Sequence, residues 1–167
     1  MKWHAISGSW RQVNSQVKKD VEGVVRIILQ RGEGIVAGGA LGVDYCATRI
    51  VLEMNRLNQI KIYLPIKLSD YCKHYLKRAQ EGVITEEHAH ELIHQLEEIY
   101  RNNPKAIFDE SRFTEANKES YYARNTMIIE NCSILHAFHV NKSKGVQDAI
   151  DKAKRLGKET IVKEYTI

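Results

Sequence analysis

A glycine-rich segment between an apolar run and a helical pattern constrains this chain more than any other feature. Residues 35–48 read Ile-Val-Ala-Gly-Gly-Ala-Leu-Gly-Val-Asp-Tyr-Cys-Ala-Thr. A strand, a glycine turn and a helix in succession bring backbone N–H groups together, and glycine lets the chain turn tightly while an anion approaches closely. An ordinary turn would need one glycine, whereas this one has Gly38, Gly39 and Gly42. The segment therefore predicts a phosphate-binding loop at the start of a helix.

The same alternation of strand and helix recurs along the chain. Short apolar runs predict five strands, at residues 3–7, 33–37, 60–64, 134–140 and 159–163. Apolar residues at steps of three and four predict five helices, at residues 17–29, 43–54, 89–100, 119–131 and 146–156. Because such alternation is typical of open α/β folds, we predict a Rossmann-like, doubly wound, mainly parallel sheet with helices on both faces.

The length of the chain, 167 residues, suits one domain with a substantial core. We therefore expect residues 1–167 to form a single Rossmann-like domain. Residues from about 66 to 118 are less regular, and we expect them to form a helical insertion or a lid beside the third strand. The basic, aromatic stretch at 71–78 within this region either contacts a nucleic acid or forms a solvated helix face.

The formal charge of +4 suits an anionic ligand but is far below that of a dedicated nucleic-acid-binding protein. The three cysteines form no CxxC pair and are interpreted as reduced thiols. Neither a signal peptide nor an apolar run of membrane-spanning length is present, so we predict a cytoplasmic protein that does not associate with membranes. His90 and His94 have a spacing that can bind a metal, but the apolar stripe of their helix places them on its wet face. We therefore predict no metal site and no cofactor.

Three loops are expected to meet where ligands bind in open α/β sheets, beyond the carboxyl ends of the strands. They are residues 8–11, 38–44 and 143–145. The predicted ligand-binding residues of these loops are Gly8, Ser9, Arg11, Gly38, Gly39, Ala40, Gly42, Val43, Asp44, Ser143, Lys144 and Gly145. No nucleophile–base pair is evident, so the catalytic residues are unknown.

Several of these side chains have an alternative, purely structural interpretation. Arg11 has the planar fork that suits a phosphate, or it is a surface arginine. Lys144 opposes the dipole of its helix, a conflict that a bound anion would relieve, or it is simply solvated. Asp44 contacts a ribose or a loop amide, or it caps its helix. Arg124 and Asn125 would be surface residues on periodicity alone.

These motifs together resemble the SLOG superfamily of Rossmann-like domains. This superfamily groups the DNA-processing protein A (Smf) family with the LOG, or lysine-decarboxylase-like, phosphoribohydrolases. The matching pieces are Ser7–Arg11, Gly38–Asp44 with Ala47, Arg124–Asn125, and Lys144–Gly145 with Ala149 and Ala153. The resemblance implies binding of a nucleotide, a nucleotide-derived molecule or a nucleic-acid backbone. It also implies that Arg124 and Asn125 contact the ligand and that the protein forms a homodimer.

Two departures from the superfamily bear on function. LOG enzymes carry a Pro-Gly-Gly-x-Gly-Thr motif and a glutamate that serves hydrolysis, whereas residues 141–148 here read Asn-Lys-Ser-Lys-Gly-Val-Gln-Asp. DNA-processing relatives usually have Arg and His where this chain has Leu41 and Thr48. The leading hypothesis is therefore a nucleotide-binding protein. The alternatives are an N-glycosidic (phosphoribo)hydrolase acting on nucleosides or nucleotides and a module that binds single-stranded nucleic acid.

Overall fold

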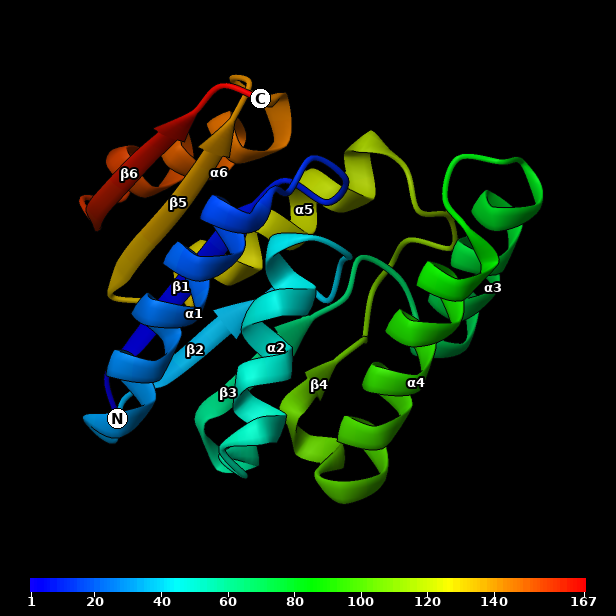
Figure 1. Cartoon of the computed structure of the whole chain (residues 1–167), viewed down its shortest axis with the longest axis horizontal. Coiled ribbons are helices and arrows are strands. Elements are labelled where there is room, and N and C mark those ends of the chain that lie inside the picture. Colours follow the sequence, from blue (N-terminus) through cyan, green and yellow to red (C-terminus); the bar gives the residue numbers. More distant parts are fainter.

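A six-stranded, entirely parallel sheet forms the centre of the computed structural model, which describes all 167 residues (Figure 1). The strand order is β4-β3-β2-β1-β5-β6. The strands are β1 (Trp3–Gly8), β2 (Gly34–Ala37), β3 (Ile60–Tyr63), β4 (Ile107–Phe108), β5 (Ile134–Val140) and β6 (Glu159–Tyr165). The helices are α1 (Ser15–Gln30), α2 (Val43–Glu53), α3 (Leu68–Gln80), α4 (Glu86–Asn102), α5 (Lys118–Glu130) and α6 (Lys144–Arg155). The predicted Rossmann-like α/β fold is confirmed, and the sheet is wholly rather than mainly parallel.

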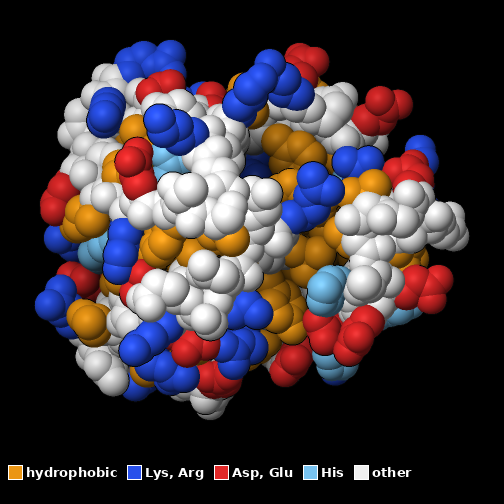
Figure 2. All heavy atoms as spheres, turned by 45° about the horizontal axis from the view of Figure 1, so that its top comes forward, with side chains coloured by type: hydrophobic (Ala, Val, Ile, Leu, Met, Phe, Trp, Pro, Cys, Tyr) orange, Lys and Arg blue, Asp and Glu red, His pale blue; other side chains and the backbone are white.

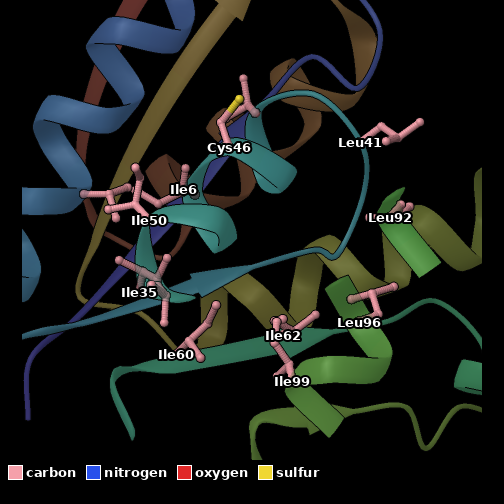
Figure 3. Packing of buried hydrophobic residues seen from close by; sticks show 14 of the residues in the cluster. Ile6, Ile35, Leu41, Cys46, Ile50, Ile60, Ile62, Leu92, Leu96 and Ile99 are labelled. Atoms are coloured by element: carbon pink, nitrogen blue, oxygen red, sulfur yellow. The ribbon is translucent and has the colours of Figure 1, made fainter. Parts of the chain in front are cut away.

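Helices cover both faces of this sheet (Figure 1). On one face, side chains of α1, α2 and α4 bury the strands; Figure 3 shows Ile50 of α2 and Leu96 of α4 beside Ile35 and Ile62. On the other face, α5 and α6 pack together over a separate apolar cluster that includes Leu135 of β5. Because β2, β3 and β4 lie to one side of β1, and β5 and β6 to the other, the winding reverses between β1 and β5.

Residues 66–118 hold more regular structure than the sequence pattern predicted. The amphipathic helix expected there is α4, whose Ala89, Leu92 and Leu96 are buried while His90 and His94 are exposed. Two elements were missed: α3, which packs against α4, and the two-residue strand β4, which pairs with β3. The description of this region as a helical insertion or lid stays a prediction. No helix of the chain is both long and apolar enough to cross a membrane.

A buried chain of polar side chains joins β1 to β5 near the middle of the sheet. Nε2 of His4 lies 2.8 Å from a carboxylate oxygen of Glu33, and Nδ1 of His4 lies 3.1 Å from Nε2 of His136. Burial, and secondarily the neighbouring His4, lower the pKa of His136 from 6.5 to about 4. His136 is therefore neutral in the folded protein at neutral pH.

We expect the protein to lose stability as the pH falls from about 6.5 to about 4. In this window the unfolded chain binds a proton at His136 that the folded chain does not, so acid favours unfolding. The expected loss is about 2 kcal/mol, after allowance for the partial exposure of this side chain to water. Urea unfolding across this range measures it. His136→Gln keeps a hydrogen-bonding group beside His4 without the titration, and an equally steep pH dependence in this variant would contradict the assignment.

Candidate functional site

A cleft of about 1000 Å³ opens at the carboxyl ends of the strands, where the winding reverses. The β1–α1 loop, the start of α6, the first half of α5 and one side of α3 line it. Figure 2, which turns this edge of the sheet forward, shows a hollow with hydrophobic side chains inside and Lys and Arg side chains around its rim.

The structure brings most of the predicted ligand-binding residues to this cleft. Those that line it are Gly8, Ser9, Arg11, Ala40, Asp44, Arg124, Asn125, Ser143, Lys144 and Gly145. Gly38, Gly39, Gly42 and Val43 do not line it. The side chains that periodicity alone would place on the surface, Arg124 and Asn125, are half-buried; Arg124 donates to the Gly38 carbonyl and Asn125 to the Gly145 carbonyl.

The start of α6 offers the clearest place for an anion. The first N–H groups of a helix have no intrahelical acceptor, and Ser143, at the N-cap, makes no capping hydrogen bond with its side chain. The Ser143 hydroxyl is buried and has no hydrogen-bond partner. Its backbone is fixed, because its N–H donates to the Val140 carbonyl at 3.1 Å and its carbonyl lies 3.1 Å from Nε2 of His139. A Cβ added at Gly145 would meet nothing within 4 Å, so an anion can approach this turn freely.

Arg124 connects α5 to the glycine turn. One of its terminal nitrogens donates to the Gly38 carbonyl, while its Nε is buried without a partner. Asp44 lies nearby and is buried, and its carboxylate accepts from the Ala40 N–H at 3.2 Å. Burial raises the pKa of Asp44, although the positive charge of Arg124 and the N–H groups of Ala40 and Gly38 oppose that shift. Arg124 and Asp44 therefore fix the turn and leave the buried Nε–H of the guanidinium without a partner.

The glycines of the turn are needed first for packing within the chain. Gly42 has φ +72°, and a Cβ there would lie 2.1 Å from the Ser9 carbonyl oxygen. Gly39 has φ +68°, and its Cβ would lie 2.5 Å from a methyl group of Leu64. A Cβ at Gly38 would lie 2.3 Å from the Arg124 guanidinium. Phosphate binding by the turn itself stays a prediction, since these contacts already require glycine.

The β1–α1 loop forms the near wall of the cleft. The Ser9 hydroxyl accepts from the Gln12 N–H at 2.9 Å, which folds the loop back on itself. The Arg11 guanidinium lies 4.8 Å from the centroid of the Trp10 ring and is exposed at the mouth of the cleft. Both side chains are therefore placed to contact a ligand that extends out of the cleft.

The far wall lies outside the predicted ligand-binding residues of the three loops, and the stretch at 71–78 was predicted only as one of two alternatives, a nucleic-acid contact or a solvated helix face. α3 contributes Lys73, His74, Lys77 and Arg78, and the start of α5 contributes Lys118. Tyr71 and Tyr75 of the same stretch are 0% and 3% exposed and pack edge-to-face against each other, so neither ring offers a free face on which a base could stack. The i, i+3, i+4 spacing of the basic residues was the available signal, but only the packing of α3 shows that they face the ligand cleft.

Two carboxylates near the cleft, Asp44 and Asp148, are already engaged, whereas Asp70 and Glu115, which line it, have no hydrogen-bond or ion-pair partner. Asp148 lies in the second turn of α6, where it accepts from Lys152 at 2.7 Å and from Asn125 at 3.0 Å. Asp44 is held as described above. Neither Asp44 nor Asp148 is free to transfer a proton to a substrate.

The strand order, the winding and the place of the cleft define this chain as a Rossmann-like α/β domain of the open, doubly wound type. Its fold is similar to that of DNA processing protein A. The chain superposes on a structure of DNA processing protein A from Helicobacter pylori, described for its single-stranded DNA binding mode, with a TM-score of 0.70 and 21% identity. That match covers 96% of this chain and 64% of the other.

Two further solved structures are similar. DNA processing protein A from Streptococcus pneumoniae matches with a TM-score of 0.65 and 18% identity, over 96% of this chain and 50% of that one. The protein TM1055 matches with a TM-score of 0.58 and 16% identity, over 96% of this chain and 72% of that one. The chain thus spans less than two thirds of the length of either DNA processing protein A. No protein-family model and no curated protein matches the sequence.

Proposed function

We propose that this protein binds a nucleotide or a nucleotide-derived ligand with a phosphate at the start of α6. The observation that carries the proposal is the buried Ser143 hydroxyl, which has no partner and sits at a helix N-terminus that lines the cleft. A buried polar atom without a partner is costly, and a phosphate oxygen would satisfy it together with the free helix N–H groups. Lys144 and the unused Nε of Arg124 would add positive charge at the same place.

The charge of the cleft supports an anionic ligand of more than one phosphate. Seven cationic side chains line it, against four carboxylates. One of those carboxylates, Glu81, is paired with Arg78 at 3.2 Å, and another, Asp44, is buried. Aromatic residues Trp10, Tyr121 and Tyr122 and the apolar side chain of Ile66 give a base or sugar an apolar surface to contact.

Lys144→Glu is expected to weaken nucleotide binding about tenfold or more, because it replaces a favourable charge beside the phosphate with a repulsive one. Lys154→Glu is the matched control, since it makes the same charge change on an exposed position near the other end of α6. Titration calorimetry with the nucleotide that gives the largest thermal shift measures both. Equal affinity in the two variants would place the phosphate elsewhere.

Ser143→Ala tests the hydroxyl more directly. Because this hydroxyl is buried and makes no hydrogen bond within the protein, its removal should not lower the melting temperature. The same change should weaken binding about fivefold, the value of one hydrogen bond of about 1 kcal/mol. Unaltered binding with unaltered stability would remove the observation on which the proposal rests.

A second candidate function is binding of single-stranded nucleic acid. Two features favour it: the cleft continues from α6 to the basic residues Lys73, Lys77 and Arg78 of α3, and the fold is shared with a protein described for binding single-stranded DNA. Affinity for an oligonucleotide should then fall steeply with salt, and Lys73→Ala with Lys77→Ala should reduce that salt dependence. A salt-independent signal would exclude this mode. Turnover to a free base would instead identify an N-glycosidic hydrolase, the third hypothesis.

A further inference from the structure

β6 is an edge strand that lacks two of the features that normally protect one, a proline and a bulge, although it carries the charged residues Glu159, Lys163 and Glu164. It pairs with β5 along all seven of its residues and has no neighbour on its other side. Ile161 is 47% exposed on one face of the strand, and Val162 is 39% exposed on the other. Natural proteins usually block such an edge, so a long regular one indicates a surface that pairs.

The backbone of β6 presents its free groups in a defined order. The Tyr165 carbonyl accepts from the Asn141 N–H at 2.9 Å, so the odd-numbered residues of the strand direct their backbone groups toward β5. Thr160, Val162 and Glu164 therefore direct theirs outward. In an antiparallel pair, residues whose backbone groups point outward hydrogen-bond to residues of the partner strand whose backbone groups also point outward. Only every second register of the two strands meets this condition.

We propose that β6 pairs antiparallel with β6 of a second copy of this chain, about a two-fold axis through Ile161. In this register Ile161 faces the partner's Ile161, and Thr160 exchanges backbone hydrogen bonds with the partner's Val162. On one face, Glu159 opposes the partner's Lys163. On the other face, Lys158 opposes the partner's Glu164. Residues 158–164 read Lys-Glu-Thr-Ile-Val-Lys-Glu. When two copies of this segment pair antiparallel, each charged residue therefore lies opposite a residue of the other sign.

Neighbouring registers lack this complementarity. An axis through Val162 would place Ile161 opposite the partner's Lys163 and Glu159 opposite the partner's Tyr165. An axis through Thr160 would place Glu159 opposite the partner's Ile161. An axis through Lys163 would oppose two like charges, which destabilises a strand pair. Charge therefore selects the register centred on Ile161.

The charged side chains remain available for these contacts. Glu159 and Glu164 are exposed, and Glu164 is 70% accessible. Lys163 lies 2.6 Å from Asp20 of α1, and Lys158 donates to the Cys132 carbonyl at 2.8 Å. Each ammonium group has three donors, so each can accept a second partner across the interface.

Such pairing would join the two sheets into one continuous sheet and leave both ligand clefts free. Because the partner strands run in opposite directions, the carboxyl ends of the strands, and with them the two clefts, would lie at opposite edges. No residue of β6 lines the cleft, so loss of pairing should not abolish ligand binding. Failure of this proposal is therefore separable from failure of the proposed function.

Cysteine cross-linking tests the register. In the proposed register, residue 161 lies opposite residue 161 of the second copy, as a non-hydrogen-bonded pair. The Cα atoms of such a pair are about 4.5 Å apart, so the cysteines of Ile161→Cys could form a disulfide. Under mild oxidation this variant should convert to a covalent dimer that reductant reverses. Val162→Cys is the matched control, because it lies about 7–8 Å from its own copy on the diagonal and should not cross-link. Cross-linking of Val162→Cys instead would overturn the register.

Substitutions that reverse the charge of Glu159 or Lys163 test whether the partner is a second copy of this chain. Glu159→Lys and Lys163→Glu should each halve the mass of the wild-type dimer in sedimentation velocity, because each opposes like charges twice. An equal mixture of the two should recover dimers, since every opposed pair is then attractive. Thermal melting verifies that each variant is folded, which matters for Lys163→Glu because it loses Asp20. A wild-type monomer, or a dimer unchanged by both single substitutions, would overturn the proposal.

Discussion

Gly42→Ala is expected to destabilise the protein by about 3 kcal/mol or more, close to the largest effect of a single substitution. The residue has φ +72° and ψ −124°, a conformation in which L side chains are strained. The added methyl group would also lie 2.1 Å from the Ser9 carbonyl and 2.8 Å from the Trp10 Cα. The β1–α1 loop would have to move away from α2, so nucleotide binding should weaken as well. Urea unfolding and calorimetry measure the two effects.

Gly23→Ala is the control for this result, with an expected effect of opposite sign. Gly23 is exposed in the interior of α1, and a Cβ there would meet nothing within 4 Å. Alanine should therefore raise the free energy of unfolding by about 1 kcal/mol through helix propensity. If Gly42→Ala were as stable as wild type, the close approach of the two loops would be contradicted.

Arg124→Met is expected to lower the free energy of unfolding by about 2–3 kcal/mol, because it leaves Asp44 buried without its counter-charge. The Gly38 carbonyl would lose its donor in the same change. Asp44→Asn in the Arg124→Met background should restore part of the loss, because the unpaired charge is then gone. A double-mutant cycle on unfolding free energies isolates this coupling, and strict additivity would show that the two side chains do not interact.

The pH dependence of Arg124→Met gives an independent measurement. Burial raises the pKa of Asp44, so the folded chain keeps its proton to a higher pH than the unfolded chain. Between those two pKa values stability falls as the pH rises. Removing Arg124 raises the pKa further, so Arg124→Met should lose more stability than wild type as the pH rises from about 4 toward neutrality. This extra slope should disappear when Arg124→Met is combined with Asp44→Asn, because the titrating carboxyl is then absent.

The pattern of apolar residues in the sequence was sufficient to predict most of the strands and helices, because its periodicity reflects directly which side chains are buried. β1 and β5 are buried runs, and α1 carries Val17, Val21 and Val25 at successive i, i+4 positions. β4 escaped prediction because two residues cannot show a period. α3 escaped because its only fully buried side chains are Tyr71 and Tyr75, which looked equally suited to an aromatic binding surface.

The candidate site was predictable in its loops but not in its walls. Residues that follow strands meet at one edge by topology, so Ser9, Ser143 and Lys144 could be grouped from the sequence. Arg124 could be added only through the family resemblance, because α5 has polar side chains toward the cleft as well as toward solvent and shows almost no amphipathic pattern. The sequence also cannot distinguish a glycine required by a phosphate from one required by a neighbouring backbone, as at Gly42.

The burial of Tyr71 and Tyr75 has a consequence for which wall of the cleft moves when the cleft opens and closes. These side chains anchor α3, a wall of the cleft, to the same apolar cluster as Leu96 of α4 and Ile62 of β3. Their backbone amides should therefore exchange with deuterium at rates close to those of the central strands, through global rather than local opening. Faster exchange is expected at the exposed tip of the β1–α1 loop, near Arg11. Entry and departure of a ligand would then be controlled from that side.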